Sequence, residues 1–391
     1  MKTRPFGKGI SAVHNALEHL GYVQIDTISV IERAHHHVLF TRANDYCPSM
    51  LDKLLSSKFV FEYWSHAAAY LPISHYRFSL PYKHALKNGK THWHKNPDRK
   101  LMQKVLHTIE RGGPMRSRDF EGGKSAQNGW WNWKPAKKAI EQLFMEGDLM
   151  IARRDGFQKV YDLTERVLPV AVDCSLPTLD EFAEYLIREQ LKCHGVVAQK
   201  SFTYLRKNPE LNSIVHRKLK NMLKSGELEE VMLPSGARFV CTKSAFDEPM
   251  QRLDNGLKIL SPFDNSTIQR QRLSEIFNFD YQIECYVPQA KRKYGYFSLP
   301  MLYRDMFIGR MDCKALRSAK RLQIRALYFE ASCFESNVRK STMIDLEKLA
   351  LAFAKSVMRF SRFQSCNEIV IDKVEPAFMK PLLTKALRDE Q

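Results

Sequence analysis

Three consecutive residues near the start of the chain carry groups that could activate a water molecule. Gln24 and Asp26 flank Ile25, shortly after a predicted helix and its stop at Gly21. In an extended or turning segment alternate side chains point to one side, so Gln24 and Asp26 would converge while Ile25 faces away. A carboxamide can hold a water by donating and accepting hydrogen bonds, and a carboxylate can take its proton. This pattern is suited to hydrolysis.

A structural explanation of the same three residues is favoured when the pattern is considered alone. A glutamine two positions before an aspartate is frequent by chance. Asp26 precedes Thr27 and could cap a helix running from Ile28 to Ala34. The case for chemistry therefore depends on the rest of the chain.

The charge balance points to a polyanionic partner. The 391 residues include 61 Lys and Arg against 43 Asp and Glu, a formal net charge of +18. Nucleic acid is the leading candidate for such a partner. No apolar stretch approaches the roughly 20 residues that span a bilayer, and no apolar signal segment follows Met1–Ile10. We expect a soluble, cytoplasmic protein associated with the nucleoid and not with a membrane.

The cysteine and histidine pattern gives little support to a metal site. The eight cysteines are scattered singly, without the close pairs of zinc or iron–sulfur sites. His35, His36 and His37 are adjacent, and adjacent side chains diverge. They are interpreted as surface or DNA-facing histidines, with a metal as the weaker alternative. We expect no metal and no cofactor.

A pattern of helices followed by a β-hairpin recurs three times along the chain. The first copy is the loosest, and the second and third are clearer. The predicted helices are Ser11–Leu20, Ser49–Leu55, Asp98–Glu110, Pro135–Glu146, Leu179–Leu191 and Asn212–Lys224. The predicted strands are Phe59–Trp64 and Ala67–Leu71, Asp148–Arg153 and Phe157–Leu163, and Leu228–Leu233 and Ala237–Thr242.

Helices followed by a hairpin wing describe a winged helix, in which one helix meets DNA and the wing touches its backbone. The predicted fold is therefore α+β, with winged-helix units over residues 1–80, 95–170 and 175–245. Such units are also common without any DNA-binding role. Three copies in a basic chain favour DNA binding.

The last part of the chain, residues 257–391, has a different, β-rich pattern. Segments at Gln282–Val287, Tyr294–Leu302, Met306–Met311 and Gln323–Phe329 predict a β-barrel-like domain, either a barrel or a curled sheet, closed by a helix over Ile344–Arg359. The first two strands would form a hairpin whose tip carries Lys291, Arg292 and Lys293. Three cations at a tip suit the minor groove or phosphates. Alternatively they are a solvated charge run that protects an edge strand.

Several segments resemble the winged-helix DNA glycosylases of the AlkZ/YcaQ family. The resemblance extends nearly to residue 330 and is most specific between Leu260 and Lys314. The segments are YVQIDTISVIERAHHHVLFTR, FEYWSHAAAYLP, GPMRSRDFEG, GWWNWKPAKKAIEQLFMEGDLM, FQKVYDLTERVLP, LSPFDN, FDYQIECYVPQAKRKYGYFSLPML and GRMDCKA. The family usually begins with one more helix before this first segment, so we expect that the N-terminus is trimmed.

The resemblance implies an activity and a catalytic motif. The family's motif of Gln, an apolar residue, then Gln or Asp falls on Gln24, Ile25 and Asp26, in the form typical of the broader YcaQ-like branch. It implies a monofunctional glycosylase that hydrolyses N7-alkylated purines and unhooks interstrand crosslinks in double-stranded DNA. We expect it to act as a monomer.

Further residues are candidate DNA contacts. His66 lies in a family-like segment and could contact DNA near the lesion or be a core histidine. Arg33 and Arg42 could bind phosphates or be solvated. The cluster Trp130, Trp131, Asn132 and Trp133 could stack on bases, although hydrophobic packing before the helix at Pro135 is favoured.

Two other functional classes fit the composition. A noncatalytic regulator would use the same winged helices only to recognise an operator. A nuclease is less favoured, because the sequence contains no clustered acidic residues of the kind that two-metal cleavage needs.

Overall fold

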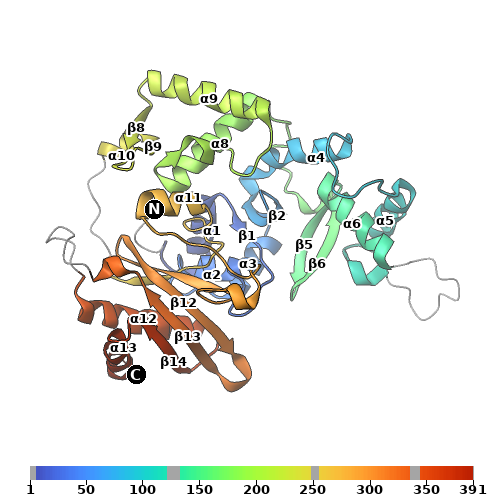
Figure 1. The fold of residues 1–391 in the computed structure, drawn as a ribbon. Coiled ribbons are helices and arrows are strands. Elements are labelled where there is room, and N and C mark those ends of the chain that lie inside the picture. Colours follow the sequence, from blue (N-terminus) through green and yellow to red (C-terminus); the bar gives the residue numbers. More distant parts are fainter. Residues whose placement is uncertain (1–5, 121–132, 248–254, 335–343, 391) are drawn as a thin grey trace.

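The computed structural model describes residues 6–120, 133–247, 255–334 and 344–390. It contains three repeats of one arrangement of helices and strands, followed by a larger sheet with two helices (Figure 1). The first repeat lies at the centre of the molecule, between the third repeat and the C-terminal sheet, and the second repeat lies to its side (Figure 1). The fold is thus α+β, as predicted.

The first repeat, residues 9–72, places a short strand between its first two helices. That strand pairs with the second strand of the hairpin, so the sheet order is β1-β3-β2. The first helix ends at Gly21, whose φ of 73° is left-handed and whose N–H donates to the carbonyl of Leu17 at 2.9 Å. The elements are α1 (Gly9–Leu20), β1 (Val23–Gln24), α2 (Ala34–Phe40), α3 (Pro48–Ser56), β2 (Val60–Trp64) and β3 (Ala68–Pro72).

The second and third repeats, residues 99–163 and 179–242, have the same strand order as the first, β4-β6-β5 and β7-β9-β8. In the second repeat the elements are α5 (Arg99–Gly112), β4 (Met115–Arg116), η2 (Ser117–Phe120), α6 (Trp133–Glu146), β5 (Leu149–Asp155) and β6 (Gln158–Leu163). In the third they are α8 (Leu179–His194), β7 (Val197–Ala198), η3 (Gln199–Ser201), α9 (Pro209–Lys224), β8 (Leu228–Met232) and β9 (Arg238–Thr242). Short elements link the repeats: η1 (Ile73–Ser79), α4 (Leu80–Lys87), α7 (Thr164–Val167) and α10 (Ser244–Asp247).

Local sequence signals explain where these helices start. The Asp98 carboxylate accepts a hydrogen bond from the Leu101 N–H at 3.0 Å and caps α5. Thr178 and Glu181 form a reciprocal capping box at the start of α8, and Asn208 caps α9 before Pro209. The six helices and three hairpins predicted from the repeated pattern are present.

The helix predicted from Ile28 to Ala34 is wrong. Residues 25–33 form an irregular segment, and α2 begins only at Ala34. Contacts with the C-terminal region use its backbone groups instead: the Val30 carbonyl accepts from the Ala315 N–H at 3.0 Å, and the Glu32 N–H donates to Gln364 Oε1 at 2.6 Å. The segment is also rich in β-branched residues, which helices disfavour.

The C-terminal region forms an open five-stranded sheet, so of the two predicted forms, a barrel or a curled sheet, the closed barrel is wrong. The order is β10-β11-β12-β13-β14, with β10 and β14 at opposite edges. The last strand is parallel to β13, because α12 crosses back over the sheet between them. The main elements are β10 (Leu257–Ile259), α11 (Arg270–Phe277), β11 (Ser298–Tyr303), β12 (Met306–Leu316), β13 (Arg321–Phe329), α12 (Leu346–Phe363), β14 (Glu368–Glu375) and α13 (Met379–Asp389). Three 3-10 turns complete the region: η4 (Gln289–Lys291), η5 (Arg317–Ala319) and η6 (Ala331–Cys333).

One hydrophobic core joins the first two repeats to the C-terminal sheet, whereas the third repeat has a core of its own. The first repeat is therefore held by packing on several sides. Within the described part of the chain, no helix combines the length and apolar character needed to cross a membrane.

Candidate active site and DNA-contacting residues

Gln24 ends the short strand β1 and faces the turn of the neighbouring hairpin. It pairs with Ala69 of β3, and the next N–H along the chain, from Ile25, donates to the Ala68 carbonyl at 2.8 Å. Ile25 packs against the main core. Alternation of side chains along an extended chain would place Gln24 and Asp26 on the side opposite Ile25, and this shared placement stays a prediction.

The Gln24 side chain is 9% exposed and is held by a histidine. Its Oε1 lies 3.1 Å from Nε2 of His66, which sits in the β2–β3 turn. Burial, and then the positive charge of Arg206, lowers the pKa of His66 to about 4. A neutral imidazole with its proton on Nε2 donates to the amide oxygen. This contact leaves the amide nitrogen of Gln24 as a donor for a water molecule.

Asp26 is half-buried at the start of the irregular segment. Its Oδ1 accepts from the Ile28 N–H at 2.7 Å, a local turn rather than a helix cap. The capping alternative therefore does not hold. Burial raises the pKa of this carboxyl above its ordinary value, and the Ile28 hydrogen bond opposes the shift. A carboxylate with a raised pKa is a stronger proton acceptor than an exposed aspartate.

The predicted hairpin with a basic tip is wrong in form. Strand β11 starts only at Ser298, and the preceding segment is irregular apart from η4. The buried Glu284 carboxylate takes backbone N–H groups that a ladder would use, accepting from Lys293 at 2.9 Å and Tyr294 at 2.7 Å. Residues 284–296, the basic loop, are thus folded around this carboxylate.

Lys291 and Lys293 are exposed on the basic loop, while Arg292 is partly covered. The Arg292 Nε donates to the Val287 carbonyl at 2.8 Å, and its guanidinium lies 5.0 Å from the Tyr296 ring. The Lys293 ammonium also lies 4.9 Å from the Tyr294 ring, so Lys291 is the most accessible of the three cations for a phosphate, and the contact with DNA stays a prediction.

Sequence reasoning missed Tyr286 as a neighbour of the candidate carboxylate. Its ring is 81% exposed, one of the most exposed large side chains in the described part of the protein. The pKa of its hydroxyl is raised by Cys285, by burial and by the charge of Asp26, and that of the Cys285 thiol by burial and then by Asp26. The charge of Asp26 therefore acts on the first residues of the basic loop. No local pattern could have indicated this, because the two segments are far apart in the sequence.

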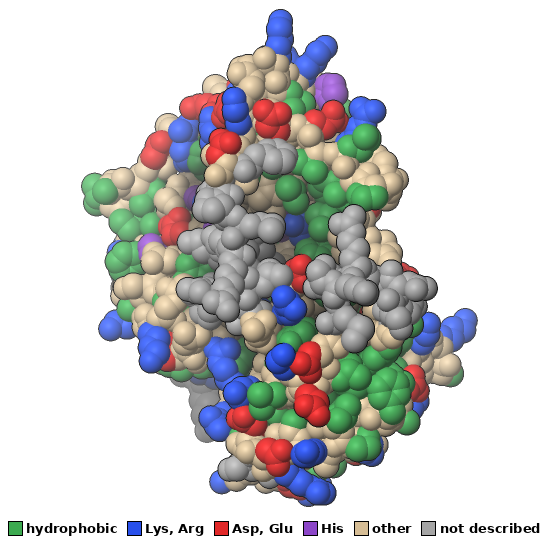
Figure 2. All heavy atoms as spheres, turned by 90° about the vertical axis from the view of Figure 1, so that its left-hand side faces the viewer, with side chains coloured by type: hydrophobic (Ala, Val, Ile, Leu, Met, Phe, Trp, Pro, Cys, Tyr) green, Lys and Arg blue, Asp and Glu red, His purple; other side chains and the backbone are tan. Residues whose placement is uncertain are grey.

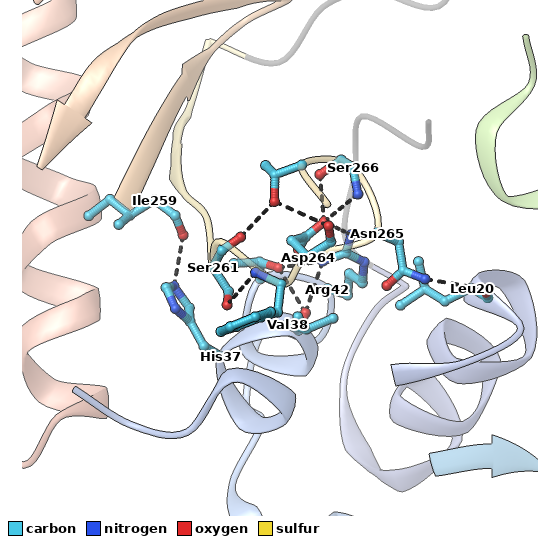
Figure 3. A network of polar contacts seen from close by, with 12 residues as sticks. Leu20, His37, Val38, Arg42, Ile259, Ser261, Asp264, Asn265 and Ser266 are labelled. Carbon is cyan, nitrogen blue, oxygen red and sulfur yellow. Dashed lines mark hydrogen bonds and ion pairs between the residues drawn. The ribbon is translucent and has the colours of Figure 1, made fainter. Parts of the chain in front are cut away.

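Arg42 does not face outward as a phosphate ligand, which corrects the prediction. Its guanidinium is buried and donates to both carboxylate oxygens of Asp264, at 2.6 and 2.7 Å (Figure 3). A third bond, at 3.0 Å, goes to the Val38 carbonyl. Because Asp264 lies in the segment after β10, this ion pair joins the first repeat to the C-terminal region.

The residue after Asp264 holds the chain that leads into β1. The Asn265 side-chain amide donates to the carbonyls of Leu20 and Tyr22, at 3.4 and 3.1 Å, between the end of α1 and Val23. Nearby, His37 Nε2 donates to the Ile259 carbonyl at 2.9 Å (Figure 3). We call the Arg42–Asp264 pair and Asn265 the clamp. It fixes the backbone two residues before Gln24.

Arg33, the other predicted phosphate ligand, lies at the border with the second repeat. Its guanidinium sits 4.0 Å from the ring of Phe157, in the β5–β6 hairpin. Its Nε is buried without a hydrogen-bond partner. Nearby, Arg154 pairs with the buried Glu62, with one contact of 2.7 Å. These contacts give Arg33 a packing role between the repeats, and a DNA contact stays a prediction.

One buried lysine also escaped sequence reasoning. Lys83 of α4 is 2% exposed, and its ammonium lies 3.9 Å from the Tyr76 ring and 4.6 Å from the Tyr63 ring. Burial lowers its pKa to about 7. A desolvated lysine is a potential nucleophile, but this one is enclosed by aromatic rings.

The histidine run and the cysteines do not converge with acidic residues. His35, His36 and His37 are buried in α2, not on the surface as predicted, and His36 contacts the Tyr46 hydroxyl at 2.7 Å. Over residues 6–120, 133–247, 255–334 and 344–390, no group of three or more His, Cys, Asp or Glu could hold a metal. Trp130, Trp131 and Asn132 lie outside the described residues, as does the Trp133 side chain.

Positive charge is spread over the surface together with negative charge. In Figure 2, blue side chains lie at the upper end, over the third repeat, and at the lower end, over the C-terminal region, with red ones among them. In the third repeat, for example, Arg217 pairs with Asp180 at 2.9 Å and Arg188 with Glu184 at 2.8 Å. Some of the basic side chains are thus paired with nearby carboxylates.

Comparisons with known proteins agree with this arrangement. The family model described as DNA glycosylase AlkZ-like matches residues 17–363. A solved structure, Streptomyces sahachiroi DNA glycosylase AlkZ, is similar with a TM-score of 0.58 at 13% identity, covering 95% of each chain. The structural likeness shows a shared fold, and the matched span includes Gln24, Asp26 and the clamp.

Proposed function

The chain belongs to the AlkZ-like family of DNA glycosylases, and on that premise we propose that it hydrolyses the N-glycosidic bond of N7-alkylated purines and unhooks interstrand crosslinks. The product in each case is an abasic site. The observation that supports the proposal is the position of Gln24 at the end of β1, hydrogen-bonded to His66 and two residues before the half-buried carboxylate of Asp26.

We interpret the three repeats as winged helices that hold duplex DNA. Each has a helix followed by a hairpin, and in each a short strand adds to that hairpin. This is the arrangement in which a helix and a wing meet DNA. The net charge of +18 supports a polyanionic substrate. We expect the enzyme to act as a monomer at the nucleoid.

The chemistry needs little acid catalysis. Alkylation at N7 places a positive charge on the purine, which makes the base a good leaving group. As the bond to the sugar breaks, positive charge develops on the deoxyribose, as in glycoside hydrolysis. A negative group fixed near the sugar then stabilises the transition state.

Asp26 and Gln24 have different roles in the hydrolysis. The Asp26 carboxylate stabilises the oxocarbenium-like sugar and takes a proton from water, which its raised pKa favours. Gln24 holds that water at the anomeric carbon through its amide nitrogen, because the amide oxygen is occupied by His66. His66 thus acts as a positioning residue, and its contact with DNA stays a prediction.

The enzyme is proposed to leave the DNA strand intact. Strand cleavage by glycosylases needs an amine that attacks the sugar as a Schiff-base nucleophile. The buried Lys83 has the lowered pKa of such an amine, but its ammonium is enclosed by aromatic rings and not offered to a substrate.

Crosslinks require a geometry without full extrusion of the base, since a base tied to the opposite strand cannot leave the duplex freely. The basic loop, whose first residues are affected by the charge of Asp26, supports an alternative approach. Its exposed Tyr286 could enter between base pairs while Lys291 and Lys293 contact phosphates. The lesion would then be reached from the groove.

A direct assay tests the proposal. Purified protein is incubated with duplex DNA containing N7-methylguanine or a nitrogen-mustard crosslink, and abasic sites are scored by alkali cleavage. We expect released base, alkali-dependent breaks and no effect of EDTA. Strand breaks without alkali, or loss of activity in EDTA, would contradict a monofunctional hydrolase. Sequence-specific binding without any released base would favour the regulator.

A further inference from the structure

The most exposed leucine in the described part of the chain lies in a turn of the third repeat, between η3 and α9. Leu205 is 66% exposed, and its φ of 58° lies in the left-handed region. This conformation is unfavourable for a leucine, because its Cβ atom crowds the following carbonyl oxygen. Among the residues that the structure describes, the other positive φ values belong to glycines and to polar or charged residues. Core packing does not explain a leucine that is both exposed and strained.

The residues on either side of Leu205 hold this turn in place. The Tyr204 ring meets the His66 ring edge to face, with centroids 5.6 Å apart. The Arg206 guanidinium lies 5.4 Å from the ring of Phe182 in α8. Strained residues that their surroundings hold in place are typical of functional positions. The turn therefore presents Leu205 to solvent while both of its neighbours stay packed.

Leu205 lines a cavity of about 660 Å³ between the first and third repeats. His66 of the β2–β3 turn lines the same cavity from the first repeat, and its Nε2 lies 3.1 Å from Oε1 of Gln24. The ring contact between Tyr204 and His66 thus connects the turn to Gln24. Leu205 is therefore one residue away from a ring that contacts the positioning residue of the candidate active site.

The charge of the cavity lining favours a polyanion. Lys90, Arg206 and Lys207 line the cavity, and within the described residues none of them has an ion pair. The lining carboxylate, Glu189, already pairs with Lys192 at 2.6 Å. Lys90 and Lys207 are exposed, and they come from two different segments, after α4 and before α9. Exposed cations without partners favour the binding of phosphate groups.

We propose that Leu205 is a wedge that enters the duplex beside the damaged nucleotide, while Lys90 and Lys207 hold phosphates of the backbone. The inference rests on the proposed function and adds a residue that prepares its substrate. An apolar side chain between two base pairs interrupts their stacking, and cations nearby offset part of the cost by binding the backbone. The weakened stacking lets the sugar of the lesion approach Gln24. A wedge acts without breaking a link between the strands, so it suits monoadducts and crosslinks alike.

Fluorescence of a base analogue tests the wedge without catalysis. Asp26→Asn protein is bound to duplex DNA that carries 2-aminopurine next to N7-methylguanine, and the emission of 2-aminopurine rises when its stacking is lost. We expect the emission to rise on binding, and Leu205→Ala in the same background should reduce this rise by about half or more. Leu351→Ala, which truncates another exposed leucine, on α12, is the matched control and should keep the full rise. An equal rise with Leu205→Ala would overturn the inference.

Rates of base release from two substrates give the second readout. Leu205→Ala and Leu205→Gly should slow release from fully paired DNA by about tenfold. They should slow release from a lesion in a bulge by no more than about twofold, because the stack is already open there. Leu205→Gly should melt no lower than the wild type, since glycine adopts a φ of 58° without strain. A slower rate would then not reflect a loss of folding.

The outcomes separate the wedge from the proposed function. Equal slowing on both substrates, or a wild-type rate of Leu205→Ala on paired DNA, would remove the wedge and leave the proposed function standing. A lower melting temperature for Leu205→Gly would contradict the strain on which the wedge depends. If the wild-type protein releases no base from either DNA, the proposed function fails, whatever the fluorescence shows.

Discussion

The first repeat and the third share one scaffold, yet only the first carries a candidate active site. In both, a two-residue strand pairs with the second hairpin strand, Gln24 with Ala69 and Ala198 with Phe239. Two residues further on, the first repeat has Asp26 and the third has Lys200. The second repeat has Arg118 at the same step after Arg116. The two cations suit contact with a backbone, whereas the carboxylate suits chemistry at a sugar.

The connections after the short strands differ in the same way. In the second and third repeats a 3-10 turn, η2 or η3, follows within one residue. In the first repeat the chain is irregular from residue 25 to residue 33, and the backbone groups of Val30 and Glu32 form hydrogen bonds with the C-terminal region. The candidate catalytic residues thus lie in the repeat whose connection after the short strand forms no 3-10 turn. The backbone of that connection bonds with the C-terminal region instead.

The largest expected effect comes from matched substitutions at the equivalent positions. Asp26→Asn should lower the single-turnover rate on N7-methylguanine DNA by about 10² to 10⁴-fold, the range for losing a general base. Lys200→Asn, at the same step of the third repeat, should leave that rate within about twofold at saturating protein. Both variants should still bind duplex DNA. Similar rate losses in the two variants would mean that the repeats are not functionally distinct.

The next effect concerns the clamp that only the first repeat has. Asp264→Ala leaves the buried Arg42 without its partner and should lower the free energy of unfolding by about 3 to 5 kcal/mol. Asp180→Ala, which breaks an exposed pair of the third repeat, should change it by no more than about 1 kcal/mol. Urea unfolding at neutral pH measures both. A small effect of Asp264→Ala would argue that the two regions are held mainly by apolar packing.

A smaller effect is expected in the salt dependence of DNA binding. Alanine at Lys291, Arg292 and Lys293 should make the plot of log affinity against log salt shallower. The change should be up to about 0.9 in slope for each residue that contacts a phosphate. Alanine at Lys380, Lys385 and Arg388 of α13 is the control, because these lie on the C-terminal helix. An unchanged slope in the loop variant would remove the basic loop from the DNA interface.

The smallest effect is a pH-dependent gain in stability. Burial raises the pKa of Asp26 from 3.8, so ionisation of this carboxyl lowers the stability of the folded state progressively as the pH rises above 3.8, and the loss is complete above the raised pKa. Asp26→Asn should therefore melt at a higher temperature than wild type at pH 7, and the difference should vanish below about pH 3.8, the ordinary value. Wild-type activity should fall as the pH drops through the raised pKa. A lower melting temperature for Asp26→Asn at pH 7 would contradict this assignment.

Local signals in the sequence predicted the repeats because their turns and caps are local. Asp98 caps α5 and Gly21 ends α1 through atoms within a few residues. The helix at Ile28 failed because its backbone groups bond with residues hundreds of positions away. The hairpin at residues 282–302 failed because Glu284 takes the N–H groups of Lys293 and Tyr294.

The site was predictable only in part for the same reason. Alternation in an extended segment predicts that Gln24 and Asp26 lie on one side, and that prediction still needs a test. The hydrogen bond between His66 and Gln24 and the electrostatic effect of Asp26 on Cys285 both join segments that local patterns do not relate. The closed form of the barrel was wrong because the edge strand β14 returns parallel to β13 after a long helix.

The hydrogen bonds of Asn265 predict what removal of the C-terminal region would do to the first repeat. A fragment ending before residue 257 would retain all three repeats and both candidate catalytic side chains, but it would lose the amide that bonds the Leu20 and Tyr22 carbonyls. Those carbonyls would turn to solvent, and the short strand carrying Gln24 would lose its register. Such a fragment should release no base, because it also loses the hydrophobic core that the first two repeats share with the C-terminal sheet. We therefore expect turnover to depend on the C-terminal region as well as on the residues that touch the sugar. A substitution that unfolds the C-terminal region would abolish activity just as a substitution in the active site does.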